Sequence, residues 1–145
     1  MDPITLKQVA EEFIPFNKFL GLKATHVERG RVRLEIPWRD ELVGDPMRPA
    51  LHGGVISMLA DTAGGMVVWS MIDNVMARVS TIDLRIDYLR PGRLEQLVAE
   101  ATVARIGGRV AVSDIRLFHM SAEAETVATG KGVYAIKIPK QAKQE

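Results

Sequence analysis

The most continuous apolar pattern of the chain lies over residues 53–71, where a single carboxylate, Asp61, interrupts it. Apolar side chains would fall on nearly every face of a helix drawn over this segment, whereas a surface helix keeps one polar face. The pattern therefore predicts a helix that other structure encloses on most sides. Polar residues inside the segment, two adjacent glycines and the lack of flanking basic anchors argue against a membrane-spanning helix.

A second helical pattern lies near the N-terminus. Residues 5–14 carry apolar side chains at helical spacing, which predicts a short amphipathic helix capped by Thr5 and ended by Pro15. The side chains of its apolar face are Leu6, Val9, Ala10, Phe13 and Ile14. We expect this helix to lie on a larger surface.

The pattern then changes to one typical of β-strands. Between residues 21 and 39, apolar and polar positions alternate around a turn at residues 28–30, which predicts a β-hairpin. Residues 40–51 contain one glycine and two prolines, and we expect a loop there.

Four strand-like runs follow the long helix, over residues 77–89, 94–105, 109–120 and 126–138. Short connections separate them, so we predict that they pair in chain order as an antiparallel meander. With the hairpin, this gives an α+β fold in which a curved antiparallel sheet of five or six strands wraps around the central helix. The polar tail at residues 139–145 is expected to be frayed.

The amino-acid composition narrows the range of possible functions. The 145 residues predict one domain over residues 1–145, and a hydrophobic fraction of 47% provides a core. Nineteen basic and eighteen acidic residues leave a net charge of +1, which argues against nucleic-acid binding. The absence of cysteine excludes a disulfide framework and a thiolate nucleophile. The first residues lack the pattern of a signal peptide, so we expect a cytoplasmic protein.

The histidine and two glycines before the long helix, His52-Gly53-Gly54, form a candidate site with Asp61. Backbone N–H groups at a helix start have no partner within the helix, and they can stabilise a negative oxygen that develops on a substrate carbonyl. The glycines have a second explanation, which is a tight turn into the helix. Asp61 is either a paired structural group or a reactive one that activates water or attacks a carbonyl carbon.

Three segments closely resemble the hotdog-fold acyl-CoA thioesterases, in the branch of the phenylacetate-pathway and 4-hydroxybenzoyl-CoA enzymes. These are residues 17–22, the HGG run with an acid nine positions after its histidine (61 − 52 = 9), and residues 80–92 with the pattern T-x-D-x-x-x-x-Y-x-R-P. The similarity covers most of the chain. It implies the hotdog fold and cofactor-free hydrolysis of an acyl-CoA to a carboxylic acid and free coenzyme A.

The resemblance also implies roles for individual residues. Asp61 is the nucleophile or general base, and Gly54, with Gly53 beside it, donates to the oxyanion. His52 positions the thioester. Thr81, found by counting back from the tyrosine of the third motif, orients the attacking water; packing in a strand is an equally good reason for a threonine there.

Further expectations concern the substrate and the assembly. Coenzyme A phosphates need basic groups at the rim of the site, and the candidates are Arg90, Arg93, Arg105 and Arg109. The resemblance implies a homodimer with joined sheets, paired into a homotetramer, whose active sites are shared between subunits. Two interpretations are open for five apolar residues, which line an acyl pocket or belong to the core; because apolar side chains at such spacing are usually core, we assign no site role to Met58, Met66, Met71, Trp69 and Phe16.

The sequence departs from the family at one position. Similar enzymes carry an asparagine or glutamine six residues before the histidine, where this chain has Pro46 (52 − 6 = 46), and Asp45 or Arg48 are the candidate substitutes. This departure keeps open a non-catalytic acyl-CoA or acyl-carrier sensor on the same fold. The pattern of a dehydratase or hydratase of this fold is not found.

We predict no metal site, because the three histidines lie far apart in the sequence.

Overall fold

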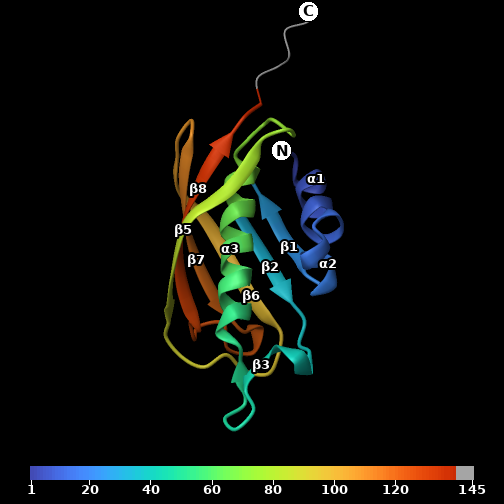
Figure 1. Ribbon diagram of the computed structural model, residues 1–145, viewed down its shortest axis with the longest axis vertical. Coiled ribbons are helices and arrows are strands. Elements are labelled where there is room, and N and C mark those ends of the chain that lie inside the picture. The colour runs from blue at the N-terminus through green and yellow to red at the C-terminus, as the bar shows by residue number, and fades with distance from the viewer. Residues whose placement is uncertain (140–145) are drawn as a thin grey trace, which may run out of the picture.

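The computed structural model describes residues 1–139, and its centre is helix α3 (Gly53–Ser70), which lies against a six-stranded antiparallel sheet (Figure 1). The strands are β1 (Lys23–Glu28), β2 (Arg31–Ile36), β5 (Arg78–Tyr88), β6 (Leu97–Ile106), β7 (Val110–Phe118) and β8 (Ala128–Lys137). The predicted α+β arrangement, with a curved sheet around a buried central helix, is confirmed. The predicted hairpin is also confirmed, because β1 pairs with β2 around a turn in which Gly30 has a φ of 84°.

The order of the strands corrects the predicted meander. The order is β1-β2-β6-β7-β8-β5, so β5 pairs with β8 and not with β6. The link between β5 and β6, residues 89–96, is too long for a hairpin turn, and it crosses the end of the sheet instead. Backbone hydrogen bonds hold it there: Leu89 N–H and Arg90 N–H donate to Val127 O, and Leu51 N–H donates to Gly92 O. Strand β5 is therefore an edge of the sheet.

The N-terminal segment forms three short helical pieces beside β1, namely α1 (Pro3–Gln8), the π-helix η1 (Val9–Phe13) and α2 (Pro15–Phe19). The predicted cap at Thr5 is wrong. Asp2 caps α1 instead, and its Oδ1 accepts a hydrogen bond from Thr5 N–H at 3.0 Å. The proline that follows Asp2 suits the first position of a helix, and the cap lies three residues earlier than predicted. Of the predicted apolar face, Phe13 is 70% exposed.

The predicted loop at residues 40–51 contains regular structure. A 3-10 turn, η2 (Asp40–Leu42), leads into a short hairpin of β3 (Val43–Asp45) and β4 (Ala50–Leu51). Strands of three and two residues are too short to produce a readable alternation in the sequence. A further 3-10 turn, η3 (Met120–Ala122), joins β7 to β8.

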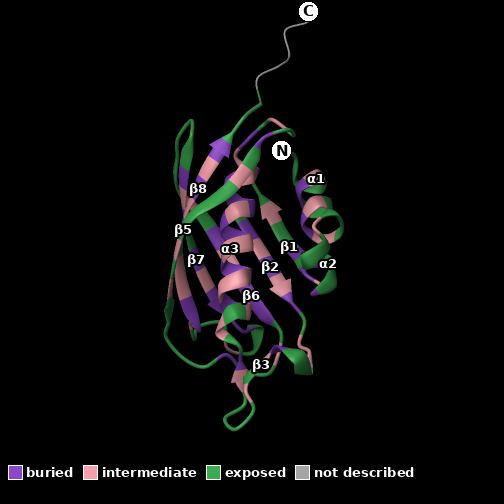
Figure 2. Cartoon of the chain, in the orientation of Figure 1, coloured by how far each residue is buried: buried purple, intermediate pink, exposed green. Residues whose placement is uncertain are grey.

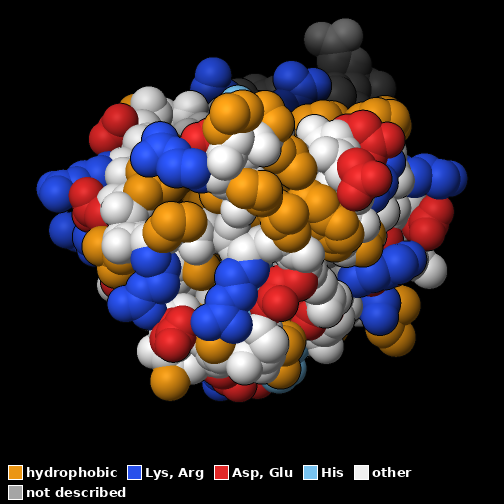
Figure 3. Space-filling view, turned by 90° about the horizontal axis from the view of Figure 1, so that it is seen from below, with side chains coloured by type: hydrophobic (Ala, Val, Ile, Leu, Met, Phe, Trp, Pro, Cys, Tyr) orange, Lys and Arg blue, Asp and Glu red, His pale blue; other side chains and the backbone are white. Residues whose placement is uncertain are grey.

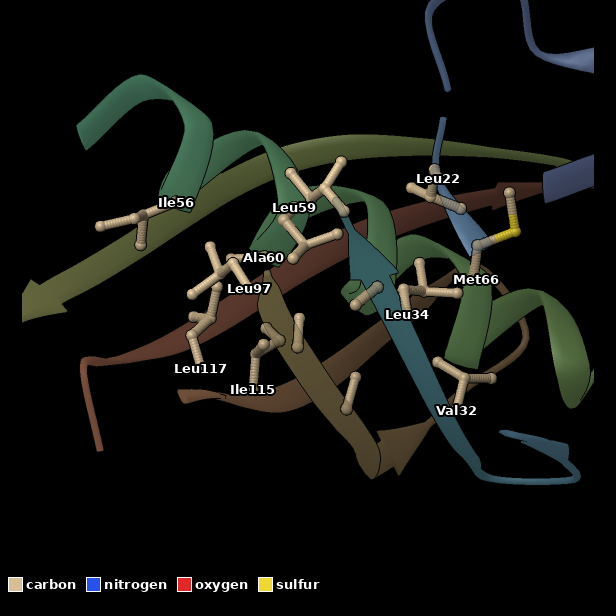
Figure 4. Packing of buried hydrophobic residues seen from close by; sticks show 14 of the residues in the cluster. Leu22, Val32, Leu34, Ile56, Leu59, Ala60, Met66, Leu97, Ile115 and Leu117 are labelled. Carbon is tan, nitrogen blue, oxygen red and sulfur yellow. The ribbon is translucent and has the colours of Figure 1, made fainter. Parts of the chain in front are cut away.

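The core fills the space between α3 and the inner face of the sheet (Figures 2 and 4). Leu59 and Val67 of α3, and Leu34, Leu97 and Leu117 of the sheet, are fully buried or nearly so. No helix within residues 1–139 is long and apolar enough to cross a bilayer. The predicted frayed tail lies outside the described residues, except for Pro139.

Candidate active site

Asp61 lies in the middle of α3, half-buried at the edge of a hollow of about 420 Å³. Its Oδ1 accepts a hydrogen bond from Thr81 Oγ1 on β5 at 2.8 Å. The carboxylate is thus neither unpaired nor fully enclosed. The hollow is otherwise mostly apolar, with side chains from α3, β5 and the N-terminal helical segment: Ile14, Phe16, Met58, Met66, Trp69 and Val79. Phe16, Met58, Met66 and Trp69 have long flexible or aromatic side chains, and the hydrophobic pattern of the sequence alone cannot distinguish such pocket residues from core residues.

A β-bulge in β5 aims Thr81 at Asp61. Thr81 pairs with Tyr134 of β8, but the next paired residue of β5 is Asp83, so Ile82 is an extra residue. Because side chains of a strand alternate between its faces, one extra residue reverses the alternation. Thr81 therefore shares the inner face with Leu84 and later even-numbered residues. In an unbroken strand it would face away from α3.

Tyr134 is a site residue that the sequence analysis missed. It is 1% exposed, and its hydroxyl donates to Asp61 O at 3.2 Å and to Asp61 Oδ1 at 3.3 Å. Burial, and after it the negative charge of Asp61, raise the pKa of the Tyr134 phenol, so it is a protonated donor at neutral pH. Ser113 Oγ lies beside the same hydroxyl without a well-aligned hydrogen bond.

Two glycines make room for this phenol. A Cβ at Gly64 of α3 would lie 2.1 Å from the Tyr134 hydroxyl oxygen, and a Cβ at Gly132 of β8 would lie 2.4 Å from it. Two features of the sequence could have pointed to Tyr134. Gly132 lies two residues before it, on the same face of a strand, and Gly64 lies inside a buried helix.

His52 caps α3. Its Nδ1 accepts a hydrogen bond from Gly54 N–H at 2.8 Å, so in the neutral ring the proton is on Nε2. Gly54 N–H therefore already has a partner. Gly53 N–H has no acceptor within the described part of the chain, while Gly53 O accepts from Tyr88 at 3.2 Å. The free donor at the start of the helix is therefore Gly53 N–H.

The structure does not bring this donor to Asp61 within one chain. The two residues are eight positions apart on α3 (61 − 53 = 8), or about 12 Å along the helix axis. A second hollow, of about 380 Å³, lies at the start of the helix, and Gly53, Tyr88 and Arg90 line it. Seen from this end of the molecule, apolar and basic side chains both reach the surface (Figure 3).

The four candidate arginines do not form one cluster. Arg90 lines the hollow beside Gly53. Arg93 is paired with Glu125 at 2.9 Å. Arg105 and Arg109 flank the turn between β6 and β7, at the other end of the sheet from Arg90, about 25 Å away along β7.

The loop around Pro46 is an exposed turn. Asp45 Oδ1 accepts from Met47 N–H and Arg48 N–H, and Asp45 Oδ2 accepts from Arg48 Nε at 3.3 Å. Both candidate substitutes for the missing amide are thus bonded to each other within the turn. Their predicted role in substrate binding stays a prediction.

Histidines have structural partners in this molecule. His119 is buried, and its Nε2 accepts from Arg93 N–H at 2.9 Å while Nδ1 lies 2.8 Å from Gln96 O. His26 lies 3.2 Å from Glu28. Within residues 1–139, no three His, Asp or Glu side chains are grouped so as to hold a metal ion.

Known proteins are similar to this chain in sequence and in fold. The family model for the thioesterase superfamily matches residues 49–125. A protein of Halobacterium salinarum is 39% identical over 124 residues, 81% of this chain and 82% of that protein. The medium/long-chain acyl-CoA thioesterase YigI of Escherichia coli is 38% identical over 127 residues, 77% of this chain and 82% of that enzyme.

A solved structure shows the same architecture. A Shewanella oneidensis protein related to the thioesterase superfamily aligns with a TM-score of 0.83 and 28% identity, over 93% of this chain and 95% of that one. The resemblance noted in the sequence is confirmed by these matches. The chain belongs to the thioesterase superfamily of hotdog-fold enzymes.

Proposed function

We propose that this enzyme hydrolyses acyl-CoA thioesters, with Asp61 as the reacting carboxylate. The observation that carries the proposal is a carboxylate held at the edge of an apolar hollow, with Oδ1 bonded to Thr81. An apolar hollow suits an acyl chain, and the carboxylate beside it suits the activation of water or attack on a thioester carbon. The similarity to YigI, a medium/long-chain acyl-CoA thioesterase, supports the same substrate class.

Two routes give the same products. As a general base, Asp61 takes a proton from water while the oxygen attacks the carbonyl carbon; the C–S bond then breaks, and the coenzyme A thiolate takes up a proton. As a nucleophile, Asp61 first forms a mixed anhydride and releases coenzyme A, and water then cleaves the anhydride. Thr81 donates to Asp61 itself in this structure, so we assign it to holding the carboxylate as well as to orienting water.

The oxyanion donor comes from a second copy of the chain. Gly53 N–H has no acceptor among the described residues, but it lies about 12 Å along α3 from Asp61. Thr81 contacts Asp61 at one end of the inner face of β5, and Tyr88 contacts Gly53 at the other end. If two copies of edge strand β5 pair antiparallel, with Thr81 opposite Tyr88 of the partner subunit, Asp61 approaches Gly53 of the partner subunit.

This pairing also accounts for the exposure of β5. The strand has eleven residues and lies at the end of the sheet, so one row of its backbone groups has no strand neighbour within residues 1–139. Long open edges of this kind are usually covered in native proteins. A two-fold axis between the β5 strands makes the contact self-complementary and gives two equivalent sites per dimer.

Coenzyme A binding is assigned to the end of the molecule where α3 begins. Arg90 lines the hollow beside Gly53, and a guanidinium there suits a phosphate group of the nucleotide. Arg93 is a weaker candidate, because Glu125 already neutralises it. Arg105 and Arg109 can serve such a site only from another subunit.

The test is release of free thiol from a panel of benzoyl-, phenylacetyl-, short-, medium- and long-chain acyl-CoA esters. We expect hydrolysis with a preference for medium or long chains, and loss of turnover in Asp61→Asn with the fold intact by circular dichroism. Saturable binding of acyl-CoA without turnover by the wild type would instead support the sensor. Near-normal turnover by Asp61→Asn would contradict the assignment of Asp61.

A further inference from the structure

Two hydroxyl groups converge on one oxygen of the Asp61 carboxylate. Thr81 Oγ1 donates to Oδ1 at 2.8 Å, and the Tyr134 hydroxyl donates to the same Oδ1 at 3.3 Å. No donor within the described residues bonds to Oδ2. One carboxylate oxygen is therefore fixed by the protein, and the other is left for a substrate or water.

We infer that Tyr134 is a positioning residue, whose hydroxyl acts with Thr81 to fix Oδ1 of Asp61 and so presents Oδ2 to the reaction. This inference rests on the proposed function. Tyr134 enters from β8, Thr81 from β5 and Asp61 from α3, so the carboxylate is held from two neighbouring strands. A carboxylate held in this way reacts in one orientation, which is a general source of catalytic efficiency.

The surrounding chain is built to accommodate the phenol. The Tyr134 hydroxyl passes where a side chain at Gly64 or Gly132 would lie, at 2.1 and 2.4 Å from their ideal Cβ positions. Glycine inside a helix or strand lowers stability relative to alanine. Both glycines stand at the places where the phenol needs space to reach Asp61.

A purely structural role makes a different prediction. Tyr134 also donates to the backbone oxygen of Asp61 at 3.2 Å, and this contact ties α3 to the sheet. Loss of that tie lowers the unfolding midpoint, but it leaves the turnover of the folded molecules unchanged. Loss of the bond to Oδ1 lowers turnover in the folded enzyme.

The decisive variant is Tyr134→Phe, which keeps the ring and removes only the hydroxyl. We expect kcat to fall about tenfold and KM to stay within about twofold, because the lost bond is to a charged group that acts in the chemical step. Thr81→Val should lower kcat in the same way, whereas Thr81→Ser, which keeps the hydroxyl, should retain a kcat close to that of the wild type.

The matched control is Ser70→Ala, which removes another buried hydroxyl at the far end of α3. Ser70 Oγ accepts from Gly30 N–H at 3.0 Å and lies outside the hollow at Asp61. This variant should lose stability and keep both kcat and KM.

A second route reaches the same hydroxyl. Gly64→Ala displaces the Tyr134 hydroxyl by direct collision, so it should also lower kcat, and the loss should be smaller in a Tyr134→Phe background. Wild-type kcat in folded Tyr134→Phe and Gly64→Ala would overturn the inference while leaving the proposed function standing. Absence of hydrolysis by the wild type across the panel would overturn the proposed function itself.

Discussion

Two neighbouring glycines of α3 should respond to the same substitution with opposite signs. Alanine is a better helix former than glycine by about 1 kcal/mol. At Gly65 a new Cβ meets its nearest neighbour, a Tyr134 ring carbon, at 3.5 Å, which is ordinary contact. Gly65→Ala should therefore stabilise the protein by about 0.5–1 kcal/mol.

At Gly64 the new methyl group collides. It would lie 2.1 Å from the Tyr134 hydroxyl and 2.8 Å from Ser113 Oγ, both between the helix and the sheet. Overpacking of this kind costs about 1–3 kcal/mol, and the distance of 2.1 Å places this site near the upper end. The helix gain of about 1 kcal/mol offsets only part of that, so Gly64→Ala should be destabilising by about 1–2 kcal/mol.

The assay is urea unfolding of both variants and the wild type at one protein concentration, because the proposed dimer would make the midpoint depend on concentration. With equal m values, the midpoint should rise for Gly65→Ala and fall for Gly64→Ala. A Gly64→Ala variant as stable as the wild type would refute the close packing of Tyr134 against α3.

Two further predictions concern charged groups. Arg90→Ala should raise KM for acyl-CoA about two- to tenfold with little change in kcat, and the increase in KM should be smaller at high salt. An unchanged KM at low ionic strength would show that Arg90 does not bind coenzyme A. Burial raises the pKa of Glu100, but hydrogen bonds and charges of Arg31 and Arg33 outweigh it and lower that pKa below its usual value. Glu100 should therefore contribute about 0.5–1 kcal/mol to the free energy of unfolding above pH 4.5, and this contribution is lost as the pH falls. The difference in stability between wild type and Glu100→Gln, measured by thermal unfolding, should accordingly narrow below about pH 4.5. A constant difference would count against the ion pairs.

The main elements were predictable because each has a strong local pattern. The helix at residues 53–71 was predicted to within one residue of its observed end, and the hairpin of β1 and β2 to within a few residues. The pairing of β5 was not predictable, because local alternation says where a strand is and not which strand it joins. The bulge at Ile82 was equally hidden, since it depends on the register with β8.

Some residues of the candidate site could likewise be predicted from the sequence, and others could not. Asp61 and Thr81 were both named from the sequence, and the structure brings them within hydrogen-bond distance. Tyr134 lies 73 residues after Asp61, and nothing local to either residue links them. The four arginines were named as candidates for one rim, whereas the fold separates Arg90 from Arg105 and Arg109 along the sheet.

The central claim is that Asp61 of one subunit and the Gly53 N–H of the partner subunit act on the same thioester. Gly53→Pro removes only that donor: proline is tolerated at the first position of a helix, the preceding His52 has extended dihedrals, and a Cβ at Gly53 meets its nearest neighbour at 3.4 Å. Loss of an oxyanion donor costs roughly a hundredfold or more in kcat. Gly53→Pro and Asp61→Asn should therefore each be nearly inactive alone.

The most direct measurement mixes these two variants in equal amounts, exchanges their subunits and measures thiol release. In a hybrid dimer with shared sites, one site carries both defects and the other carries none. Since half of the dimers are hybrids under random exchange, the mixture should recover about a quarter of wild-type activity. A mixture that exchanges subunits, shown by mass spectrometry of the intact dimers, and stays inactive would contradict the shared site.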